Sequence, residues 1–582
     1  MKKFFLVLLS TLFVSTSVFA QNDDSVLMKV GKQKVTKSEF VSAYQKNNLL
    51  SEASEKDLRE YLELYINYRL KVQEAVSMQL DTAVAFQREL SSYMNQAAQP
   101  YLTDAEVTDK LLEEAYERSK YQVRASHILI RCNQNAVPKD TLAAYNKIMQ
   151  IRNEIVDGLD FGTAAAKYSE DESARDYVNP QNGRFHYGNR GELGYFSVME
   201  MIYPFECGAY PTPVGQVSMP LRPQFGYHII MVKDKVPAMA KIYVSQVFVK
   251  DTAALSNKVS PEIQAKLQAI KDAVQKGASF DELVNRYSED EASKEKGGSM
   301  DPFNPNRRPG DYVAKAIALK KGQVSAEPVC SVLGWHFLRL DSIVYATVND
   351  ETRFMLKNKL SRDSRAQKSK ESLVSKLKAE YSYNEKGKTA AMKFFKKNVP
   401  ENYFQTTNVK LESLKGFEKL KPMCTFADQQ ITALDFTKYI SRFKGTQLNI
   451  PVSDFLEQLF PRMVTDKMLL YEHVNLPQKY PEYKALIQEF HDGMLLYEIN
   501  AQKVWNAAIK DSVGIEKFYE TVKTDYPVAE PNDSIQYRPL SDIRAVIINR
   551  YQDSLENQWI KELRAKYPVE VDEEVFKTIL KK

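Results

Sequence analysis

Three of the six histidines are the side chains best suited to chemistry in this sequence. His127 lies in an alternating apolar segment, and His228 and His336 each begin a later apolar segment. Histidine changes its charge between pH 5 and 8, so two histidines on neighbouring strands could tune the electrostatics of a binding site. A strand histidine can also be a packed, hydrogen-bonded residue without a catalytic role, and this alternative stays open for each of them.

The sequence lacks the short motifs of several other enzyme classes. It contains no GxSxG, HExxH, P-loop or GxGxxG motif, which argues against the corresponding hydrolases, metalloproteases and nucleotide-binding enzymes. The cysteines lack the spacing of a metal site or a CxxC motif, so we expect no metal and no cofactor. They could form disulfides in an exported protein or be buried as free thiols. These cysteines are Cys132, Cys207, Cys330 and Cys424.

The three histidines lie in two similar stretches of the chain. Residues 167–172 read Lys-Tyr-Ser-Glu-Asp-Glu, and residues 286–291 read Arg-Tyr-Ser-Glu-Asp-Glu. Further on, Phe225–His228 reads Phe-Gly-Tyr-His, and Leu333–His336 reads Leu-Gly-Trp-His. Self-similarity at a nearly constant spacing indicates two copies of one structural element.

We define repeat 1 as residues 122–236 and repeat 2 as residues 241–344. Repeat 1 is the longer by about a dozen residues, because it contains an extra segment at 175–190. This segment is rich in Asn, Gly and aromatic residues, a composition that predicts a loop.

Each repeat predicts the same order of elements: strand, helix, shorter helix, Gly-punctuated strand, short helix and final strand. The first helix is expected at 139–156 in repeat 1 and at 261–275 in repeat 2, and Gly158 and Gly277 follow as C-terminal caps. This order predicts an α+β domain with helices packed on a sheet. Adjacent strands of that sheet could bring His127 and His228 together.

The segments on either side of the repeats are predicted to be mostly helical. Residues 28–40 and 426–436 each predict a short strand pair followed by an N-capped helix. We therefore expect a multidomain α+β protein, in which two α+β domains are inserted in a mostly helical body made from both ends of the chain. Long helices are expected at 58–78, 452–474 and 541–566, and a last strand at 568–571.

Several motifs of repeat 1 occur in a characteristic order. Ala125–Leu129 opens the series, Gly191–Phe196 and Phe205–Glu206 follow, and Phe225–Ile230 closes it. In this order and spacing repeat 1 resembles the parvulin family of peptidyl-prolyl isomerases, and repeat 2 resembles the same family in degenerate form. The resemblance implies two parvulin-like domains, each an antiparallel sheet with packed helices, and catalysis of peptidyl-prolyl cis–trans isomerisation.

The resemblance also implies which residues form the site in repeat 1. His127, Asp171 and His228 take the positions of the polar catalytic residues. The pocket for the substrate proline ring is expected to be lined by Leu193, Met201, Phe205 and Phe225.

Both repeats depart from the family pattern. The family has Thr or Ser five residues before the last histidine, where repeat 1 has Pro223, which lacks a hydroxyl and a backbone N–H. Ser126 could supply a hydroxyl instead. In repeat 2, Gln246 replaces the first histidine, Met300 the pocket leucine and Tyr312 the pocket phenylalanine. We therefore expect repeat 2 to be a peptide-binding or spacer domain without catalytic activity.

The N-terminus predicts export. Two lysines, a short apolar run and small residues before Ala20 are typical of a secretory signal peptide at residues 1–20, cleaved after Ala20. The flanks resemble those of SurA- and PrsA-type periplasmic chaperones, with an N-terminal helical chaperone domain expected at 21–121 and a helical region with a closing helix and strand at 345–582. A periplasmic location is implied.

The expected partners are unfolded or nascent exported polypeptides that contain X–Pro bonds. The chain has a formal net charge of only +5, so no nucleic acid is expected, and no integral membrane segment is expected after signal removal. The alternative is a non-catalytic chaperone that binds unfolded polypeptide and in which both parvulin domains are vestigial.

Overall fold

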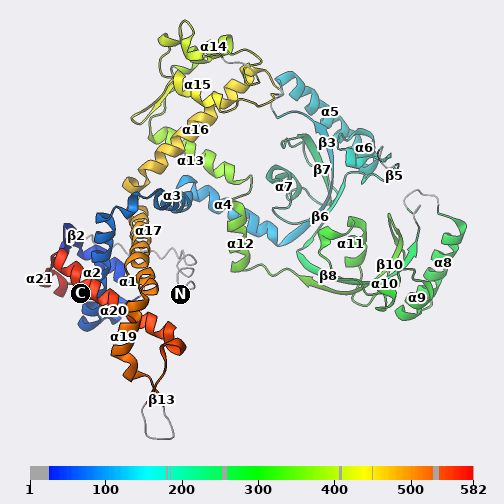
Figure 1. Cartoon of the computed structure of the whole chain (residues 1–582). Helices are drawn as coiled ribbons and strands as arrows, with labels where there is room; N and C mark the ends of the chain where they lie inside the picture. Colours follow the sequence, from blue (N-terminus) through cyan, green and yellow to red (C-terminus); the bar gives the residue numbers. More distant parts are fainter. Residues whose placement is uncertain are drawn as a thin grey trace. The chain divides into compact units, whose positions relative to one another are not determined.

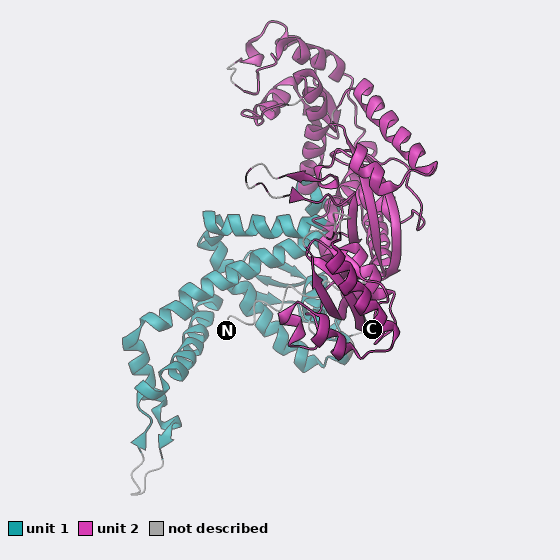
Figure 2. Cartoon of the chain, turned by 90° about the vertical axis from the view of Figure 1, so that its right-hand side faces the viewer, with its two compact units in different colours: residues 1–99, 474–582 teal, residues 100–473 magenta. Residues whose placement is uncertain are grey.

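The computed structural model describes residues 25–580, apart from residues 47, 135, 179–180, 182, 184, 252–253, 255–258, 406–408, 449 and 529–535. The expected signal peptide and its cleavage after Ala20 lie outside the described residues. The chain divides into two compact units, which Figure 2 colours separately: unit 1 comprises Met1–Gln99 and Val474–Lys582, and unit 2 comprises Pro100–His473. This division is coarser than the domain boundaries expected from the sequence, which stay a prediction.

Unit 1 contains a sheet built from both ends of the chain. Strand β1 (Val26–Val30) pairs antiparallel with β2 (Gln33–Thr36) on one side and with β15 (Val569–Val571) on the other. One hydrophobic core joins Leu27 and Phe40 to side chains near the C-terminus, including Ile499 and Trp559. The two ends of the sequence therefore share one core, as the sequence predicts.

The remaining elements of unit 1 are mostly helices. They are α1 (Lys37–Gln45), α2 (Glu55–Ser77), α3 (Val84–Ala98), α17 (Pro481–Asn500), α18 (Asn506–Lys510), α19 (Ser512–Val522), β13 (Pro527–Val528), β14 (Gln536–Tyr537), α20 (Leu540–Lys566) and α21 (Glu573–Lys577).

Repeat 1 forms a three-stranded antiparallel sheet in the order β6–β3–β7 (Figure 1). Its central strand, β3 (Tyr121–Arg131), lies between β6 (Glu192–Phe196) and β7 (Gly226–Pro237). Successive side chains of β3 and β7 point to opposite faces of this sheet. Helices α5 (Pro138–Val156) and α6 (Phe161–Tyr168) pack on one face, against residues such as Ile128 and Ile229.

The short helix α7 (Tyr203–Ala209) packs on the opposite face of this sheet. Its Phe205 shares a core with Val123 and Ala125 of β3 and with Ile230 of β7. Because side chains alternate, His127 and His228 lie on this same face. The sheet therefore carries both histidines beneath α7.

Repeat 2 has the same order of helices around a second three-stranded sheet, β8–β10–β9. One expected strand is missing from this sheet. The segment that corresponds to β6 forms only isolated bridges, at Ser299 with Ser245 and at Phe303 with Ile242, and the register shifts by one residue between them. The elements are β8 (Met239–Lys250), α8 (Pro261–Gln275), α9 (Phe280–Tyr287), α10 (Glu291–Lys294), α11 (Gly310–Ile317), β9 (Val329–Ser331) and β10 (Gly334–Tyr345).

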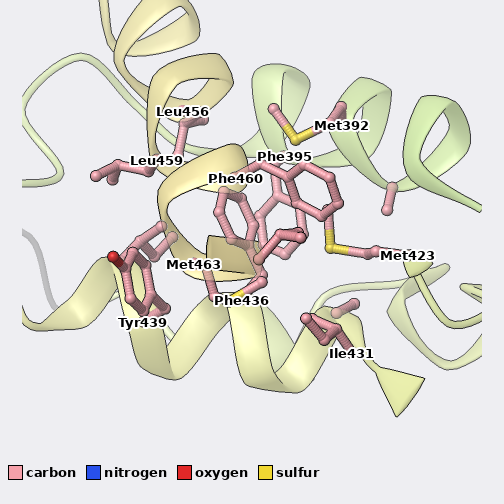
Figure 3. Close-up of a cluster of buried hydrophobic side chains, with 14 of the residues drawn as sticks. Met392, Phe395, Met423, Ile431, Phe436, Tyr439, Leu456, Leu459, Phe460 and Met463 are labelled. Atoms are coloured by element: carbon pink, nitrogen blue, oxygen red, sulfur yellow. The ribbon is translucent and has the colours of Figure 1, made fainter. Parts of the chain in front are cut away.

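The rest of unit 2 is mostly helical. Its residues between Val374 and Met468 form a core in which Phe395, Phe436 and Phe460 pack together (Figure 3), whereas α4 (Ala105–Ser119) and α12 (Asp350–Leu360) pack with Val198 and Tyr203 of repeat 1. Thr432 caps α15, and Thr36 caps α1 in the same manner after a short strand pair, as expected. The elements are α4 before repeat 1 and, after repeat 2, α12, α13 (Ala366–Glu380), α14 (Lys388–Asn398), β11 (Cys424–Phe426), β12 (Gln429–Ile431), α15 (Ala433–Ser441) and α16 (Val452–Lys479), whose last residues belong to unit 1.

Two further expectations are refined by the structure. The extra segment of repeat 1 is not only a loop, because β4 (Tyr177–Val178) pairs with β5 (Phe185–His186) as a short antiparallel hairpin. All four cysteines are free thiols, and Cys132 and Cys424 are buried. Among the described residues, every helix is too short or too polar to cross a membrane.

Candidate functional site

The Ser-Glu-Asp motif of repeat 1 binds the edge of β3 beyond Ser126, where the pairing of β3 with β6 ends. The backbone N–H of Leu129 donates to Ser169 Oγ (3.2 Å), and the N–H of Glu170 donates back to the Leu129 carbonyl (2.7 Å). The carboxylate of Glu170 accepts from the N–H of Arg131 (2.7 Å). Two residues of the motif thus bind the strand, and this fixes Asp171 beside His127.

Repeat 2 makes the same docking contacts. The N–H of Phe248 donates to Ser288 Oγ (3.2 Å), and the N–H of Glu289 donates to the Phe248 carbonyl (2.8 Å). The carboxylate of Glu289 accepts from the N–H of Lys250 (2.7 Å). The recurrence of the motif in the sequence therefore has a structural cause, which is independent of catalysis.

Three polar side chains of repeat 1 form a continuous hydrogen-bonded chain. Asp171 Oδ2 lies 2.9 Å from His127 Nε2, and His127 Nδ1 lies 3.1 Å from His228 Nδ1. The two imidazoles are nearly parallel, with ring centroids 5.3 Å apart. The structure thus brings together the three residues that the sequence identifies as polar site residues.

The protonation states follow from the burial of these groups. Burial, with a smaller contribution from His127, lowers the pKa of His228 to about 4. Burial also lowers the pKa of His127, although the carboxylate of Asp171 opposes this shift. Partial burial would raise the pKa of Asp171, but hydrogen bonds from Ser173 and His127 outweigh it, and its pKa lies below the ordinary value. At neutral pH both imidazoles are uncharged and Asp171 is ionised.

These states fix the direction of the hydrogen bonds. An ionised carboxylate only accepts, so His127 donates from Nε2 to Asp171. His127 Nδ1 then accepts, and His228 donates to it from Nδ1. His228 Nε2 is left as an acceptor, and this buried atom has no hydrogen-bond partner among the described residues.

Three apolar side chains, Phe205, Leu193 and Met201, belong to the cluster beside the two histidines, and we call them the apolar wall. The Phe205 ring lies edge-on to both imidazoles, with each centroid 6.0 Å away. Leu193 and Met201 are partly buried and pack against the same cluster as Phe205. Phe225 differs, because its side chain is 65% exposed and does not join this cluster. Three of the four expected pocket residues are therefore brought together.

The corresponding network of repeat 2 is complete and has one more member. Asp290 Oδ2 accepts from Gln246 Nε2 (3.0 Å), Gln246 Oε1 lies 2.8 Å from His336 Nδ1, and His336 Nε2 lies 2.8 Å from Ser331 Oγ. Burial lowers the pKa of His336 to about 4, so this imidazole is neutral as well. The amide of Gln246 donates and accepts in the places where His127 does in repeat 1.

The network of repeat 2 shows which group is missing from the network of repeat 1, where Pro223 takes the place of a serine. Ser331 stands five residues before His336 and supplies a hydroxyl, whereas Pro223 stands five residues before His228 and supplies none. Ser126 does not compensate, because its hydroxyl donates to Glu192 Oε2 (3.3 Å) instead. In repeat 2 the Tyr312 ring packs edge-on to His336 with centroids 5.4 Å apart, as Phe205 does to His228, but its added hydroxyl is buried and has no hydrogen-bond partner among the described residues.

Two polar contacts near the site carry no signal in the sequence. Ser173 donates to Asp171 Oδ1 from both its N–H (3.0 Å) and its hydroxyl (2.9 Å). Glu206, next to Phe205 in α7, is fully buried and accepts from the fully buried guanidinium of Arg365 (3.0 Å). Burial raises the pKa of Glu206, and Arg365 opposes that shift. Arg365 is 159 residues away in the sequence, so no local pattern could reveal this pair.

The described residues show no group of three or more His, Cys, Asp or Glu side chains arranged to hold a metal ion. The two neutral imidazoles and the ionised carboxylate of Asp171 lie beside the apolar cluster that contains Phe205.

Comparison with known families identifies both repeats. Residues 110–236 match one model of the PPIC-type PPIase domain, and residues 248–342 match a second model with the same description. The two matched ranges contain the two polar networks described above.

Curated proteins similar to this chain include chaperones and foldases. The chaperone SurA of Thiobacillus denitrificans is 28% identical over 279 residues, which cover 48% of this chain and 61% of that protein. The foldase protein PrsA of a Geobacillus species is 28% identical over 255 residues, covering 40% of this chain and 81% of that protein. The chain thus spans less than two thirds of the length of the SurA relative. A crystal structure of a PrsA peptidylprolyl isomerase from Bacillus anthracis is 28% identical over 24% of this chain and 60% of that chain, with a TM-score of 0.17.

Proposed function

The chain carries two PPIC-type PPIase domains, and we propose that it is a peptidyl-prolyl cis–trans isomerase and folding chaperone whose catalytic site lies in repeat 1. The observation that carries this proposal is the hydrogen-bonded chain from Asp171 through His127 to His228 beneath an apolar wall. The similarity to SurA and PrsA proteins supports the chaperone part.

The proposed chemistry follows from the nature of the X–Pro bond. Rotation about this bond meets a barrier of ~18–20 kcal/mol, because the C–N bond has partial double-bond character. A catalyst therefore needs to bind the twisted amide more strongly than either planar form, and no covalent step is required. Leu193, Met201 and Phe205 would hold the proline ring, with Phe225 at the rim.

The polar chain would act on the rotating carbonyl. Two neutral imidazoles keep the floor of the site uncharged, while the ionised carboxylate of Asp171 is held at one end by His127 and Ser173. As the amide twists, its nitrogen gains electron density and its carbonyl loses conjugation, so a fixed arrangement of dipoles can favour the twisted form. His127 and His228 are proposed as positioning residues for this arrangement.

Repeat 2 is proposed to bind polypeptide without catalysing isomerisation. Its polar network is intact, but Tyr312 adds a buried hydroxyl where repeat 1 has Phe205, and Met300 stands where repeat 1 has Leu193. The proposed location is periplasmic, with the signal peptide at residues 1–20 removed, and the proposed clients are unfolded exported polypeptides with X–Pro bonds.

The test is a proline-isomerisation assay on the chain from residue 21 onward, comparing Asp171→Ala with Asp290→Ala. The two carboxylates occupy equivalent places in the two repeats, so each variant is the control for the other. We expect Asp171→Ala to lower kcat/KM at least tenfold and Asp290→Ala to leave it within twofold. Absence of any acceleration by the unaltered protein, together with suppression of client aggregation, would instead support the non-catalytic chaperone.

A further inference from the structure

The hairpin β4–β5 of repeat 1 is an exposed aromatic element beside the candidate site. Tyr177 and Phe185 are 49% and 53% exposed, and Val178 is 58% exposed. Tyr177 stacks on His186 with ring centroids 4.8 Å apart, and Phe185 lies edge-on to Tyr187 at 4.9 Å. Both faces of this hairpin therefore carry aromatic side chains, and none of the described hydrophobic cores includes them.

The base of the hairpin is hydrogen-bonded, through Ser173, to the carboxylate of Asp171. Asn189 donates from its N–H to the Ser173 carbonyl (2.8 Å) and from its side-chain amide to Ser173 Oγ (3.2 Å). Ser173 in turn donates to Asp171 Oδ1. Asn189 Oδ1 also accepts from the N–H of Gly191, whose carbonyl accepts from the N–H of His127 (both 2.9 Å).

Two other contacts make this base close-packed. Asp176 forms an ion pair with Arg190 (2.7 Å) and accepts from the N–H of Gly188 (2.8 Å). A Cβ atom on Gly188 would come within 2.5 Å of the Ala174 carbonyl, so the two sides of the base are in direct contact. An isolated two-stranded hairpin is marginally stable, and these bonds supply the support that it lacks.

Repeat 2 provides a comparison within the same chain. The N–H of Gln246 donates to the carbonyl of Gly298, as that of His127 does to Gly191. Twenty positions separate Asp171 from Gly191, but only eight separate Asp290 from Gly298. Repeat 2, whose pocket is altered, therefore also lacks the hairpin. The aromatic hairpin occurs only in repeat 1, the repeat that keeps the apolar wall.

We propose that the hairpin β4–β5 is a second contact site for the polypeptide whose X–Pro bond occupies the pocket of repeat 1. This inference rests on the proposed function and adds a preference for apolar or aromatic side chains several residues from the proline. Six residues separate Asp171 from Tyr177, so the two lie no more than ~20 Å apart, and six residues of an extended client cover the same distance. Aromatic rings bind such side chains in any sequence context, which suits an unfolded client.

The experiment uses the chain from residue 21 onward and three substrates. One is a blocked tetrapeptide with a single X–Pro bond, and the others are 13-residue peptides with a central proline and either Trp or Ser six residues away on both sides. The hairpin variant is Tyr177→Ser with Phe185→Ser, which leaves Asn189 and Asp176 in place. The matched control is Leu142→Ser with Val156→Ser, two equally exposed apolar residues of α5, on the face opposite α7.

For the unaltered protein and the control we expect kcat/KM to be about tenfold higher with the Trp peptide than with the Ser peptide, since one aromatic contact of this kind is worth about tenfold. The hairpin variant should lose this preference and keep the tetrapeptide rate within twofold. A hairpin variant that keeps the preference, or that loses the tetrapeptide rate equally, would overturn the proposal. If the unaltered protein does not accelerate isomerisation of the tetrapeptide, the proposed function is wrong. The hairpin is then tested separately by fluorescence anisotropy, which compares the affinities of the hairpin variant and the control for the labelled Trp peptide. Equal affinities would overturn the proposal.

Discussion

Ser331 Oγ lies 2.8 Å from His336 Nε2, whereas the same nitrogen of His228 is buried without a hydrogen-bond partner among the described residues, and Pro223 takes the sequence position of Ser331. The two repeats thus show one network with and without its last hydroxyl. A buried acceptor that gains a hydrogen bond stabilises the network by ~1 kcal/mol.

The first prediction therefore concerns Pro223→Ser. The new hydroxyl should donate to His228 Nε2, hold the imidazole pair more firmly and raise kcat/KM about threefold to fivefold, as expected for ~1 kcal/mol. Pro223→Ala is the matched control, because it removes the ring without adding a hydroxyl. Equal rates for the serine and alanine variants would show that the hydroxyl is not the missing element.

The second prediction compares His127→Gln with His127→Ala. Gln246 performs the donor and acceptor roles of His127 in repeat 2, so glutamine should keep Asp171 and His228 connected. Alanine leaves both partners unsatisfied, which costs ~1–3 kcal/mol. Hydrogen exchange of the β3 and β7 amides measures the local free energy of opening, and we expect the loss in the glutamine variant to be less than half that in the alanine variant. Equal losses would mean that the amide does not replace the imidazole.

The third prediction is a pH dependence. His228 has a pKa of about 4 in the folded protein and ~6.5 when unfolded, so between these values the unfolded state binds more protons. The free energy of unfolding of repeat 1 should therefore fall as the pH falls from ~6.5 towards 4, with a slope of at most ~1.4 kcal/mol per pH unit for this group. The isomerisation rate, followed by exchange NMR without a protease, depends on the protonation of the folded protein, so it should stay constant down to about pH 5 and fall as the pH approaches 4.

A control for this pH dependence is His228→Asn, which cannot take up a proton there. This variant should be less active at pH 7 but should lose the part of the slope between pH 6.5 and 4 that His228 contributes. An unchanged slope would assign the pH dependence to other groups.

The fourth prediction concerns the buried pair of Arg365 and Glu206, both of which are fully buried. Arg365→Ala leaves the carboxylate of Glu206 without its main partner, and breaking such a buried pair costs ~3–5 kcal/mol. Because Glu206 adjoins Phe205 in α7, the substitution should also raise KM for proline peptides. Arg362→Ala is the matched control, since Arg362 is exposed in the same connection. Urea unfolding measured by circular dichroism should separate the two variants.

Part of this site could be predicted from the sequence for a definite reason. Each of the two histidines lies in an apolar strand whose side chains alternate between the two faces of the sheet. Once the two strands are neighbours, this alternation places both histidines on the same face. Asp171 could be placed because it belongs to a motif that recurs in repeat 2. The recurrence itself comes from the docking of Ser169 and Glu170 on β3, and no periodicity indicates that contact.

The rest of the site depends on contacts between residues far apart in the sequence. Arg365 reaches Glu206 from a connection beyond repeat 2, and a single arginine in a polar segment has no distinguishing pattern. Gln246 looked like the loss of a histidine, although its amide keeps the network connected. The prediction of a continuous strand there in repeat 2 was wrong, because the pairing with β8 shifts its register between Ser299 and Phe303 and leaves only isolated bridges. The hairpin β4–β5 was hidden because its strands are only two residues long.

The pairing of β1 with β15 determines the order in which parts of the chain can fold. Lys29 and Glu570 are 541 residues apart, yet they join neighbouring strands of one sheet. A chain that emerges from its N-terminus presents β1 long before β15 is made, so one edge of β1 stays unpaired throughout synthesis. The sheets of the two repeats close over much shorter stretches and can fold early. The sheet of unit 1 is therefore completed later than those of the repeats, once residues 569–571 have been made.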